Sequence, residues 1–575
     1  MHSTMFAMPL TIARILRHGS TIHGSSTVGT WNGDGFDRLT YAEVGERAAR
    51  LAHALRTRLG VDVGTRPQDR QGVVGTFMWN NARHLELCLA VPAMGAVAHP
   101  VNLRMTDAQI AYTVRHSGDE VLVVDAVLID VLAPVLPLLP STLRHIVVAG
   151  PGDRGPLAGF AGEVHDYEEL IADSPSDYPW EEELDEHTAA VICYTSGTTG
   201  HPKGIVYSHR SIYLHCLQGA APNRYDLTLR ETAFPIGPMF HVNGWGIPHA
   251  AFATGADLLL TDRHSKPASL ARIIEAGRPG VAAAVPTVWT GLLDELDARP
   301  RDTSSLRRGL VGGSACPPGL IAAYRERHGV ELLHAWGMAE TSSLVTTALP
   351  PRGVDAEQEW AHRVSQGQFP VSVRFRVVGP DGAVVPNDGV STGELQLRGP
   401  CVTAAYHGGV DAPPHRPAEH FTADGWLRTG DIGNVSPDGF LTLTDRAKDV
   451  IKSGGEFISS VALENALTEH PAVVEAAVVA VSDDHWGERP LAAVSLRAGS
   501  RVDFEDLRDF LRLHLASWMV PERWAVVGRV PKTSVGKHDK RRIRDEYARG
   551  LLDVVHLGGR PGGGAAAGQA GPAGG

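Results

Sequence analysis

Short apolar runs alternate with helix-like segments along most of this chain, and this alternation restricts the fold more than any other feature of the sequence. The runs are VVGTFMWNN (73–81), VLVVD (121–125), HIVVAG (145–150), AAVICYT (189–195), GADLLLT (255–261) and GVAAAVP (280–286). Continuous apolar runs of this length are typical of strands that are buried on both faces of a largely parallel sheet. The sequence therefore predicts a layered α/β fold with catalytic loops at strand ends.

One helix is especially well defined by its apolar spacing. Apolar residues recur at helical intervals through TYAEVGERAARLAHALRT, at Val44, Ala48, Leu51, Ala52 and Leu55. Thr40 stands at the start of this pattern, where a hydroxyl side chain commonly caps a helix. We expect a helix that begins after Thr40 and packs its apolar face on the core.

The length of 575 residues exceeds what one hydrophobic core usually serves, so several lobes are expected. We predict an N-terminal domain over 1–444, with a β-rich, mainly antiparallel subdomain at about 370–444. A hinge at 445–449 would lead into a compact α+β domain at 450–555. Residues 556–575 are rich in Gly and Ala and are predicted to be a disordered tail.

Charge and cysteine content exclude several classes of protein. The formal net charge is −12 and no basic block precedes residues 537–544, so nucleic acid is not an expected partner. The five cysteines are scattered, which argues against a disulfide framework or a zinc cluster. The apolar stretch 121–140 is interrupted by two aspartates and three prolines, so no integral membrane segment is expected. A cytoplasmic location follows by default.

The strongest chemical signal is the segment AVICYTSGTTGHPKG at residues 190–204, a strand that opens into a loop of Ser, Thr and Gly. Glycine lets backbone N–H groups approach phosphate oxygens, hydroxyls add donors, and Lys203 supplies a positive charge. The familiar NTPase loop needs Ser or Thr directly after the lysine, where this chain has Gly204. The segment therefore predicts a polyphosphate-binding loop of another kind.

YTSGTTGHPKG resembles the phosphate loop of the adenylate-forming, ATP-dependent AMP-binding superfamily, which includes acyl-CoA synthetases, luciferases and peptide-synthetase adenylation domains. Four further segments resemble motifs of that family in the same order: GGSACPPG (312–319), HAWGMAET (334–341), WLRTGD (426–431) and PKTSVGKHDKRRIR (531–544). The resemblance covers about residues 10 to 550. It implies a large N-terminal adenylate-forming domain and a small, mobile α+β C-terminal domain.

The resemblance also implies roles for individual residues. Trp336 would stack on adenine, Glu340 would hold Mg²⁺, Asp431 would bind the ribose hydroxyls with help from Arg446, and Lys537 would be catalytic. The ATP- and AMP-binding residues would be Thr195, Ser196, Gly197, Thr198, Thr199, Gly200, Lys203, Gly313, Ser314, Ala315, Ala335, Trp336, Gly337, Met338, Thr341, Asp431 and Arg446.

The second substrate implied by the resemblance is coenzyme A. Lys448 occupies the hinge position, and Gly454, Gly455 and Glu456 would lie near the incoming CoA. In this family the C-terminal domain rotates between two half-reactions, first acyl-AMP formation with loss of pyrophosphate and then thioester formation with loss of AMP. The resemblance further implies a homodimer formed through the N-terminal domain.

The acid to be activated is indicated by PIGPMFHVNGWGIPHAAFATGA (235–256), which is largely apolar. This segment resembles medium- and long-chain fatty-acyl-CoA synthetases. His241 would lie beside the carboxylate, and Trp245 and Gly246 would border the acyl pocket, with the Trp245 ring gating it. On the residues alone, His241 and Trp245 fit core packing equally well. No charged residue is placed to hold an amino group, so a hydrophobic carboxylate is expected.

Several alternatives remain open at this stage. Ala339 stands where the family usually has Thr, so a hydroxyl that would contact the α-phosphate is missing. A catalytically silent nucleotide- or acyl-binding protein is therefore one alternative. An acyl-AMP ligase, or a CoA ligase for aromatic or other carboxylates, would use the same first step. GVSTG (389–393) matches a hydrolase motif, but the strand-like GELQLRG follows it where a helix is required, so we predict a hairpin turn.

Overall fold

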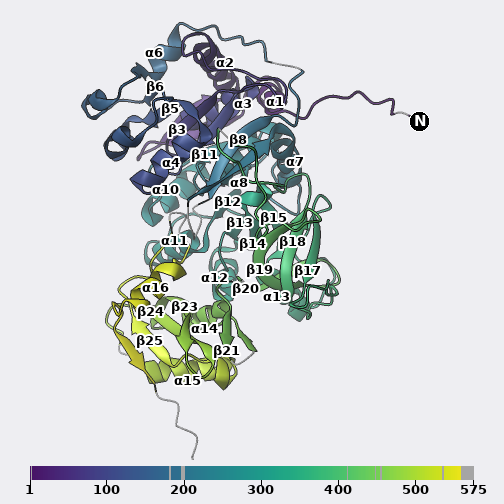
Figure 1. The fold of residues 1–575 in the computed structure, drawn as a ribbon, viewed down its shortest axis with the longest axis vertical. Helices are drawn as coiled ribbons and strands as arrows, with labels where there is room; N and C mark the ends of the chain where they lie inside the picture. The colour runs from purple at the N-terminus through teal and green to yellow at the C-terminus, as the bar shows by residue number, and fades with distance from the viewer. Residues whose placement is uncertain are drawn as a thin grey trace, which may run out of the picture. The chain divides into compact units, whose positions relative to one another are not determined.

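The computed structural model describes residues 1, 3–180, 183–195, 201–410, 412–446, 448–453, 456–500, 502–533 and 537–557. Contacts divide the chain into two compact units. The large unit comprises Met1–Thr444 and Thr533–Lys537, and the small unit comprises Asp445–Lys532 and His538–Gly575. Both units combine helices with sheets, which confirms the predicted α/β class (Figure 1).

A seven-stranded sheet forms the first layer of the large unit within the described residues. Its strands, in spatial order, are β7 (Glu163–Asp166), β6 (His145–Ala149), β5 (Asp119–Asp125), β3 (Val73–Phe77), β4 (Val97–Pro100), β8 (Ala189–Thr195) and β9 (Lys203–Ser208). All neighbouring pairs are parallel except β8 and β9, which form an antiparallel hairpin. The hairpin therefore lies at one edge of the sheet, and β7 lies at the other.

Both faces of this sheet are buried, as the continuous apolar runs predict. Val121 and Val123 of β5 belong to one hydrophobic cluster, while Leu122 and Val124 belong to another on the opposite face. The strand predicted over 73–81 is shorter than expected, because β3 ends at Phe77. Beyond it, the Asn81 side chain accepts a hydrogen bond from the backbone N–H of His84 and begins the next helix.

A thirteen-stranded sheet forms the second layer among the described residues. Its order is β17 (Arg374–Val378), β18 (Gly393–Arg398), β19 (Leu427–Val435), β20 (Phe440–Arg446), β16 (Gly367–Gln368), β15 (Ser343–Thr347), β14 (Glu331–Met338), β13 (Arg308–Gly312), β12 (Val281–Ala284), β10 (Thr232–Pro235), β11 (Asp257–Leu260), β1 (Thr27–Trp31) and β2 (Phe36–Thr40). The strands from β14 to β1 are parallel, whereas β15 to β18 pair antiparallel where pairings are given. The β-rich segment predicted near 370–444 thus continues this sheet.

The helices of the large unit cover these sheets (Figure 1). They are α1 (Ile12–Ile22), α2 (Tyr41–Thr57), α3 (Ala82–Ala93), α4 (Asp107–Ser117), α5 (Ile129–Leu132), α6 (Tyr167–Ala172), α7 (His209–Ala220), α8 (Val242–Trp245), α9 (Ile247–Thr254), α10 (Pro267–Gly277), α11 (Pro286–Ala298), α12 (Pro318–His328) and α13 (Ala356–Val364). Thr40 and Glu43 form a reciprocal capping box at the start of α2, so the predicted cap is present.

The small unit is a sheet covered by helices. Its strands are β22 (Glu456–Ile458), β21 (Ile451–Ser453), β24 (Gly487–Leu496), β25 (Arg523–Val526), β26 (Val554–His556) and β23 (Val473–Asp483), and its helices are α14 (Ser460–Glu469), α15 (Phe504–His514) and α16 (Lys540–Ala548). β26 includes His556, where the predicted tail begins. Residues 558–575 lie outside the described part.

Two further expectations concern cysteines and membranes. All five cysteines are buried and free, so none of them forms a disulfide, as expected from their scattered positions in the sequence. Across the described residues, no helix is both long and apolar enough to cross a membrane.

The GVSTG segment leads into β18, so the strand expected after this motif is present. In the turn before the strand, the Asp388 carboxylate accepts hydrogen bonds from the N–H groups of Val390 and Ser391.

Candidate active site

The β8–β9 hairpin positions the two ends of the predicted phosphate loop. Thr195, the last residue of β8, is the register partner of Lys203, the first residue of β9. Thr195 and Lys203, which flank the predicted loop in sequence, therefore lie next to each other at the sheet edge. The predicted donors Ser196, Gly197, Thr198, Thr199 and Gly200 lie outside the described residues, and their role stays a prediction.

Lys203 and Glu340 lie in one polar cluster. The Lys203 ammonium is hydrogen-bonded to the His420 ring and lies 5.0 Å from the centre of the Tyr406 ring. The Tyr406 hydroxyl donates a hydrogen bond of 2.9 Å to Oε1 of Glu340. Burial lowers the pKa of Lys203, and the carboxylates of Glu340 and Glu419 oppose that shift. The cluster thus places a lysine cation and a buried carboxylate around one aromatic ring.

Glu340 is held by a tight turn between β14 and β15. Its side chain is buried, and its backbone carbonyl accepts a 2.7 Å hydrogen bond from the N–H of Thr403. A Cβ at Gly337 would lie 1.7 Å from the Ser343 carbonyl oxygen, so only glycine allows this close approach of the two strands. The local sequence therefore fixes where the Glu340 carboxylate stands.

The hydroxyl of Thr341 is engaged within the same turn. It accepts a 3.0 Å hydrogen bond from the Met338 N–H, and the carbonyl oxygens of Met338 and Ser343 each lie 3.0 Å away. Tyr207 donates a hydrogen bond of 2.7 Å to the carbonyl of Ala339. The Thr341 hydroxyl is consequently used to shape the backbone next to Ala339.

The predicted adenine and ribose residues meet directly. The indole Nε1–H of Trp336 donates a 2.8 Å hydrogen bond to Oδ2 of Asp431, and both side chains are buried. Gly312 at the end of β13 pairs in register with Ala335, which brings the predicted loop residues Gly313, Ser314 and Ala315 next to β14. Gly313 has φ +87°, a conformation that favours glycine.

The predicted acyl segment contains a run of left-handed backbone, and this run includes α8, which is therefore a left-handed turn and not a regular α-helix. Val242, Asn243, Gly244, Trp245 and Gly246 all have φ between 50° and 73°. Each non-glycine residue in this conformation costs roughly 1–2 kcal/mol, and β-branched Val is the least suited to it. The Trp245 side chain is 9% exposed, and its carbonyl accepts a 2.5 Å hydrogen bond from the Tyr225 hydroxyl. Burial and this hydrogen bond to its backbone thus hold Trp245 in a strained turn before α9.

His241 directly precedes this left-handed turn. Burial, reinforced by the positive charges of Lys537 and Arg104, lowers the pKa of His241 to about 3. Its imidazole is therefore neutral at pH 7. A neutral ring can donate one hydrogen bond and accept another, but it does not provide a cation for a carboxylate.

Lys537 belongs by its contacts to the large unit, together with Thr533. The backbone of Lys537 makes two hydrogen bonds with Thr533. The Lys537 N–H donates to the Thr533 hydroxyl at 3.2 Å, and the Lys537 carbonyl accepts from the Thr533 N–H at 2.7 Å. The Lys537 Cε would lie 3.9 Å from a Cβ built on Gly313. Lys537 therefore lies next to Gly313, and its charge acts on His241.

The predicted hinge and CoA residues are only partly described. Lys448 is exposed, and the neighbouring Asp445 carboxylate accepts 2.6 Å hydrogen bonds from the N–H and hydroxyl of Ser460. Gly454 and Gly455 lie outside the described residues, as does the side chain of Glu456. The roles of Arg446, Lys448 and these three residues stay predictions.

Comparison with known sequences decides the family. Residues 23–407 match the family described as "AMP-binding enzyme", and residues 462–537 match "AMP-binding enzyme C-terminal domain". The chain belongs to the AMP-binding enzyme family. The resemblance inferred from the five motifs is thereby confirmed.

Relatives of this AMP-binding enzyme span nearly its whole length. It is 37% identical to the "3-methylmercaptopropionyl-CoA ligase" of Ruegeria lacuscaerulensis, over 95% of this chain and 99% of that protein. It is 39% identical to the "Long-chain-fatty-acid--CoA ligase" of Thermus thermophilus, over 95% of this chain and 97% of that protein. A solved anthranilate CoA ligase, AuaEII in complex with anthranoyl-AMP, has a TM-score of 0.83 at 23% identity and covers 96% of this chain and 100% of its own. That structure shows the same fold.

Sequence reasoning missed two members of the polar cluster in this AMP-binding enzyme. Tyr406 and His420 lie in irregular segments between β18 and β19, in AAYHGG and PAEHF. An isolated Tyr or His in a loop carries no spacing that marks it as functional. Their contacts with Glu340 and Lys203 depend on the tertiary fold.

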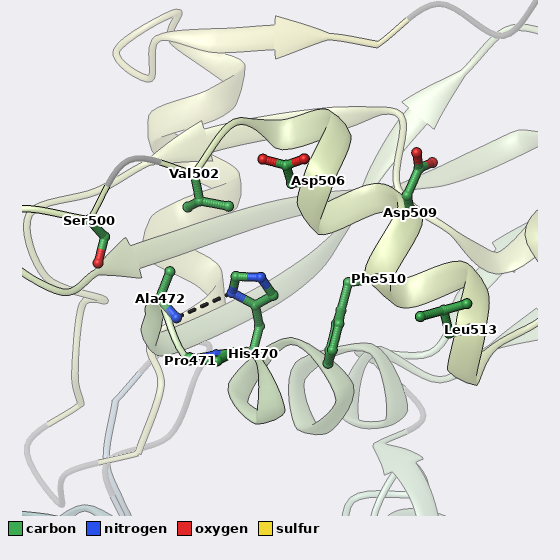
Figure 2. Close-up of a pocket in the computed structure, with 9 residues that line it drawn as sticks. All are labelled: His470, Pro471, Ala472, Ser500, Val502, Asp506, Asp509, Phe510 and Leu513. Carbon is green, nitrogen blue, oxygen red and sulfur yellow. Dashed lines mark hydrogen bonds between the residues drawn. The ribbon is translucent and has the colours of Figure 1, made fainter.

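A depression of about 720 Å³ is present in the small unit of this AMP-binding enzyme (Figure 2). The rings of His470 and Phe510 pack edge to face within it, with ring centres 5.0 Å apart. The depression is lined by His470, Pro471, Ala472, Ser500, Val502, Asp506, Asp509, Phe510 and Leu513. None of these is a predicted site residue.

Proposed function

We propose that this chain is a CoA ligase for medium- or long-chain fatty acids. The coarser statement, that it is an AMP-forming acid–thiol ligase, follows from its family and from the CoA ligases to which it is similar over nearly its whole length. The observation that carries the proposal is the meeting of predicted nucleotide residues on β14 and its turn. Trp336 contacts Asp431 there, and Glu340 lies four residues later in the cluster with Lys203.

The first half-reaction brings two anions together. A carboxylate oxygen attacks the α-phosphorus of ATP, an O–P bond forms, and pyrophosphate leaves with the electrons of the broken P–O bond. Lys203, Lys537 and the hydroxyl and N–H donors of the phosphate loop would offset the charge on the phosphates. Preorganised donors of this kind contribute about 10²- to 10³-fold each to the rate.

The residues present fit Mg²⁺ bound with the nucleotide. Mg²⁺ is usually held by one or two carboxylates together with substrate phosphates and water. Glu340 offers one buried carboxylate, oriented through Oε1 by the Tyr406 hydroxyl. A bound Mg²⁺ would supply charge neutralisation at the departing pyrophosphate. Glu340 is the residue that we propose holds it.

His241 is proposed to orient the acid. Because its pKa is lowered to about 3, the ring stays neutral and would donate a hydrogen bond to the carboxylate without neutralising it. The carboxylate thus keeps the charge that makes it a nucleophile. In the second half-reaction the CoA thiol gives up its proton to solvent and its sulfur attacks the acyl carbon; the C–S bond forms, the acyl C–O bond to the phosphate breaks, and AMP leaves with that electron pair. Lys448 is proposed as the hinge residue about which the C-terminal domain rotates between the two half-reactions.

A second candidate substrate is a short, functionalised carboxylate. Polar side chains surround the left-handed turn: His215 lies beside Gly246 and 3.1 Å from the Ser343 hydroxyl, and the Tyr225 hydroxyl is bonded to the turn. A long alkyl chain gains nothing from such groups. Similarity to a relative named "3-methylmercaptopropionyl-CoA ligase" also favours a short, functionalised carboxylate. The homodimer and the cytoplasmic location expected from the sequence stay predictions.

The test is pyrophosphate release from ATP and Mg²⁺ with C4 to C18 fatty acids, 3-methylmercaptopropionate and aromatic acids, with and without CoA. We expect fatty-acid-dependent release with acyl-CoA formation, and a loss of at least about 10²-fold in Lys537→Ala. Lys266→Ala is the matched control, since Lys266 is exposed and has no proposed role.

Each other outcome would change the proposal. Preference for 3-methylmercaptopropionate or the shortest acids would favour the second candidate substrate, and preference for aromatic acids would favour an aromatic-acid CoA ligase. Acyl-AMP without thioester would favour an acyl-AMP ligase. Absence of turnover with every acid would contradict the ligase proposal and favour a silent binding protein.

A further inference from the structure

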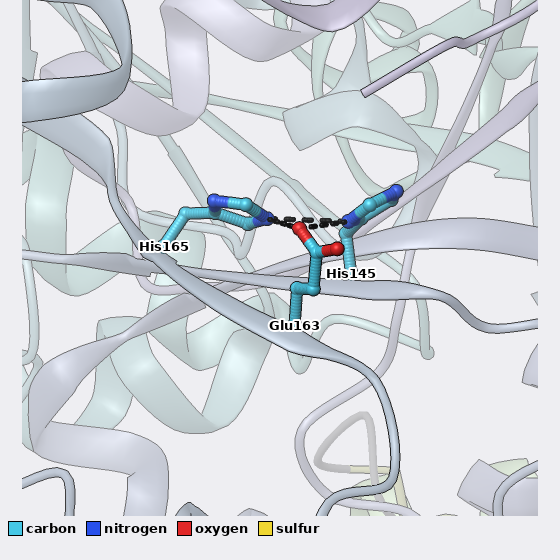
Figure 3. Close-up of side chains that lie close together, drawn as sticks. All are labelled: His145, Glu163 and His165. Atoms are coloured by element: carbon cyan, nitrogen blue, oxygen red, sulfur yellow. Dashed lines mark hydrogen bonds and ion pairs between the residues drawn. The ribbon is translucent and has the colours of Figure 1, made fainter. Parts of the chain in front are cut away.

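Three potential metal ligands gather at one edge of the seven-stranded sheet. His145 lies on β6, and Glu163 and His165 lie on β7, the edge strand. His145 is the parallel register partner of Glu163. Residues two apart on a strand share a face, so His165 projects to the same side as Glu163. Figure 3 shows the three side chains pointing toward one another.

The donor atoms are spaced as ligands of one metal ion. Nδ1 of His145 lies 3.2 Å from Nε2 of His165. Oε2 of Glu163 lies 3.8 Å from the first of these nitrogens and 3.5 Å from the second. Zinc bonds of about 2.0–2.2 Å in a tetrahedral site separate neighbouring ligand atoms by about 3.3–3.6 Å. An ion at the centre would therefore require only a small movement of Glu163.

The surrounding chemistry also suits a cation. The nearest fixed cation in sequence is Arg144, and its guanidinium is paired with Glu120 at 2.9 Å. The histidines are largely covered, with 13% and 22% of their side chains exposed, whereas Glu163 is 73% exposed and leaves the site open to an ion from solvent.

We propose that His145, Glu163 and His165 bind a divalent transition-metal ion such as Zn²⁺, with a remaining coordination position open to water. Two imidazoles and one carboxylate favour metals of intermediate softness, whereas Mg²⁺ and Ca²⁺ prefer oxygen ligands. The site is distinct from the candidate active site, because β6 and β7 lie at the sheet edge opposite the β8–β9 hairpin.

The bound ion would fasten the edge strand to the sheet. β7 leads directly into α6, whose Glu168 forms ion pairs with Arg47 at 2.9 Å and Arg83 at 2.8 Å. A metal link between β6 and β7 would therefore stabilise the attachment of α6 as well as of the edge strand. Edge strands are the parts of a sheet most prone to fraying and to pairing with other chains.

The experiment is a zinc titration of the full-length, tag-free protein against a chromophoric chelator, without nucleotide. We expect the wild type to bind one more equivalent of Zn²⁺ than His165→Gln, and Glu163→Gln to bind that ion at least about tenfold more weakly. Co²⁺ in place of Zn²⁺ should give visible absorption in the wild type that is lost in His165→Gln.

His187→Gln is the matched control. His187 is exposed and lies 3.0 Å from the Asp185 carboxylate, and it is not part of a three-ligand group among the described residues. Its stoichiometry should equal that of the wild type. Equal zinc stoichiometry and affinity in the wild type and His165→Gln would overturn the proposal. Should His165→Gln fail to fold, Glu163→Gln still decides it, because its side chain is mostly in solvent.

Discussion

At the scale of single residues, Ala339 is the position where the resemblance predicts a departure from the family motif, and the structure shows what surrounds it. Tyr207 fixes its carbonyl, and the Thr341 hydroxyl two residues later is occupied by the backbone of Met338 and Ser343. Thr341 is therefore poorly placed to supply the missing hydroxyl. A new hydroxyl at position 339 would add a donor to a turn whose backbone is already fixed.

We expect Ala339→Thr to increase the rate of acid-dependent pyrophosphate release by about tenfold, equivalent to about 1.4 kcal/mol of transition-state stabilisation. The measurement is kcat/KM for ATP at saturating acid. Ala339→Val is the control, because it adds the same bulk without the hydroxyl and should not raise the rate. Equal rates in the two variants would show that the hydroxyl has no catalytic value here.

At the scale of elements, two glycines in the left-handed turn before α9 allow the cost of backbone strain and the cost of a packing collision to be measured separately. A Cβ at Gly244 would meet its nearest atoms at 3.4 Å, which is ordinary contact, whereas a Cβ at Gly246 would lie 2.4 Å from the His215 ring. Both glycines have positive φ, at 58° and 73°. Gly244→Ala thus adds strain, and Gly246→Ala adds strain and a collision.

We expect Gly244→Ala to lower the free energy of unfolding by about 1–2 kcal/mol, and Gly246→Ala to lower it by about 1–3 kcal/mol more. Denaturant unfolding followed by tryptophan fluorescence measures both. The double variant Gly246→Ala/His215→Ala should be less destabilised than the sum of its single changes. Additive costs would mean that His215 does not confine the turn.

Elements of this fold differ in how far the sequence predicts them. The helix after Thr40 and the strand VLVVD were predictable, because a capping residue or a continuous apolar run marks each locally. The strand from Val73 was predicted too long, since Trp79 and Asn81 are apolar or neutral in sequence but form a turn held by the Asp125 carboxylate. That contact joins residues far apart in the chain.

In the candidate site, too, some residues were predictable from the sequence and others depend on the tertiary fold. The resemblance to family motifs predicted Trp336, Glu340 and Asp431 as site residues, and the first and last of these are in contact. The left-handed conformation at Val242 was not predictable, because valine is among the residues least suited to positive φ. Tyr406 was missed because only the fold brings its hydroxyl to Glu340.

At the scale of the whole molecule, buried neutral histidines link stability to pH. Burial lowers the pKa of His209 to about 3, and that of His84, His215, His249 and His334 to about 4. The unfolded chain takes up protons on these residues near pH 6.5, while the folded chain does not. Stability is therefore unaffected by them above about pH 6.5 and falls as the pH drops from there toward 4.

His209→Asn tests this linkage at one buried ring. The backbone N–H of Ile12 donates a 3.3 Å hydrogen bond to Nδ1 of His209, and an asparagine Oδ1 can accept that bond without ever taking up a proton. Each pKa unit corresponds to about 1.4 kcal/mol, so between pH 6.5 and 5 the variant should lose about 2 kcal/mol less stability than the wild type. Denaturant midpoints across that range measure the difference, with the exposed His187→Gln as the control that should follow the wild type. Parallel curves for His209→Asn and the wild type would mean that His209 does not contribute to acid unfolding, and the carboxylates would then have to account for it.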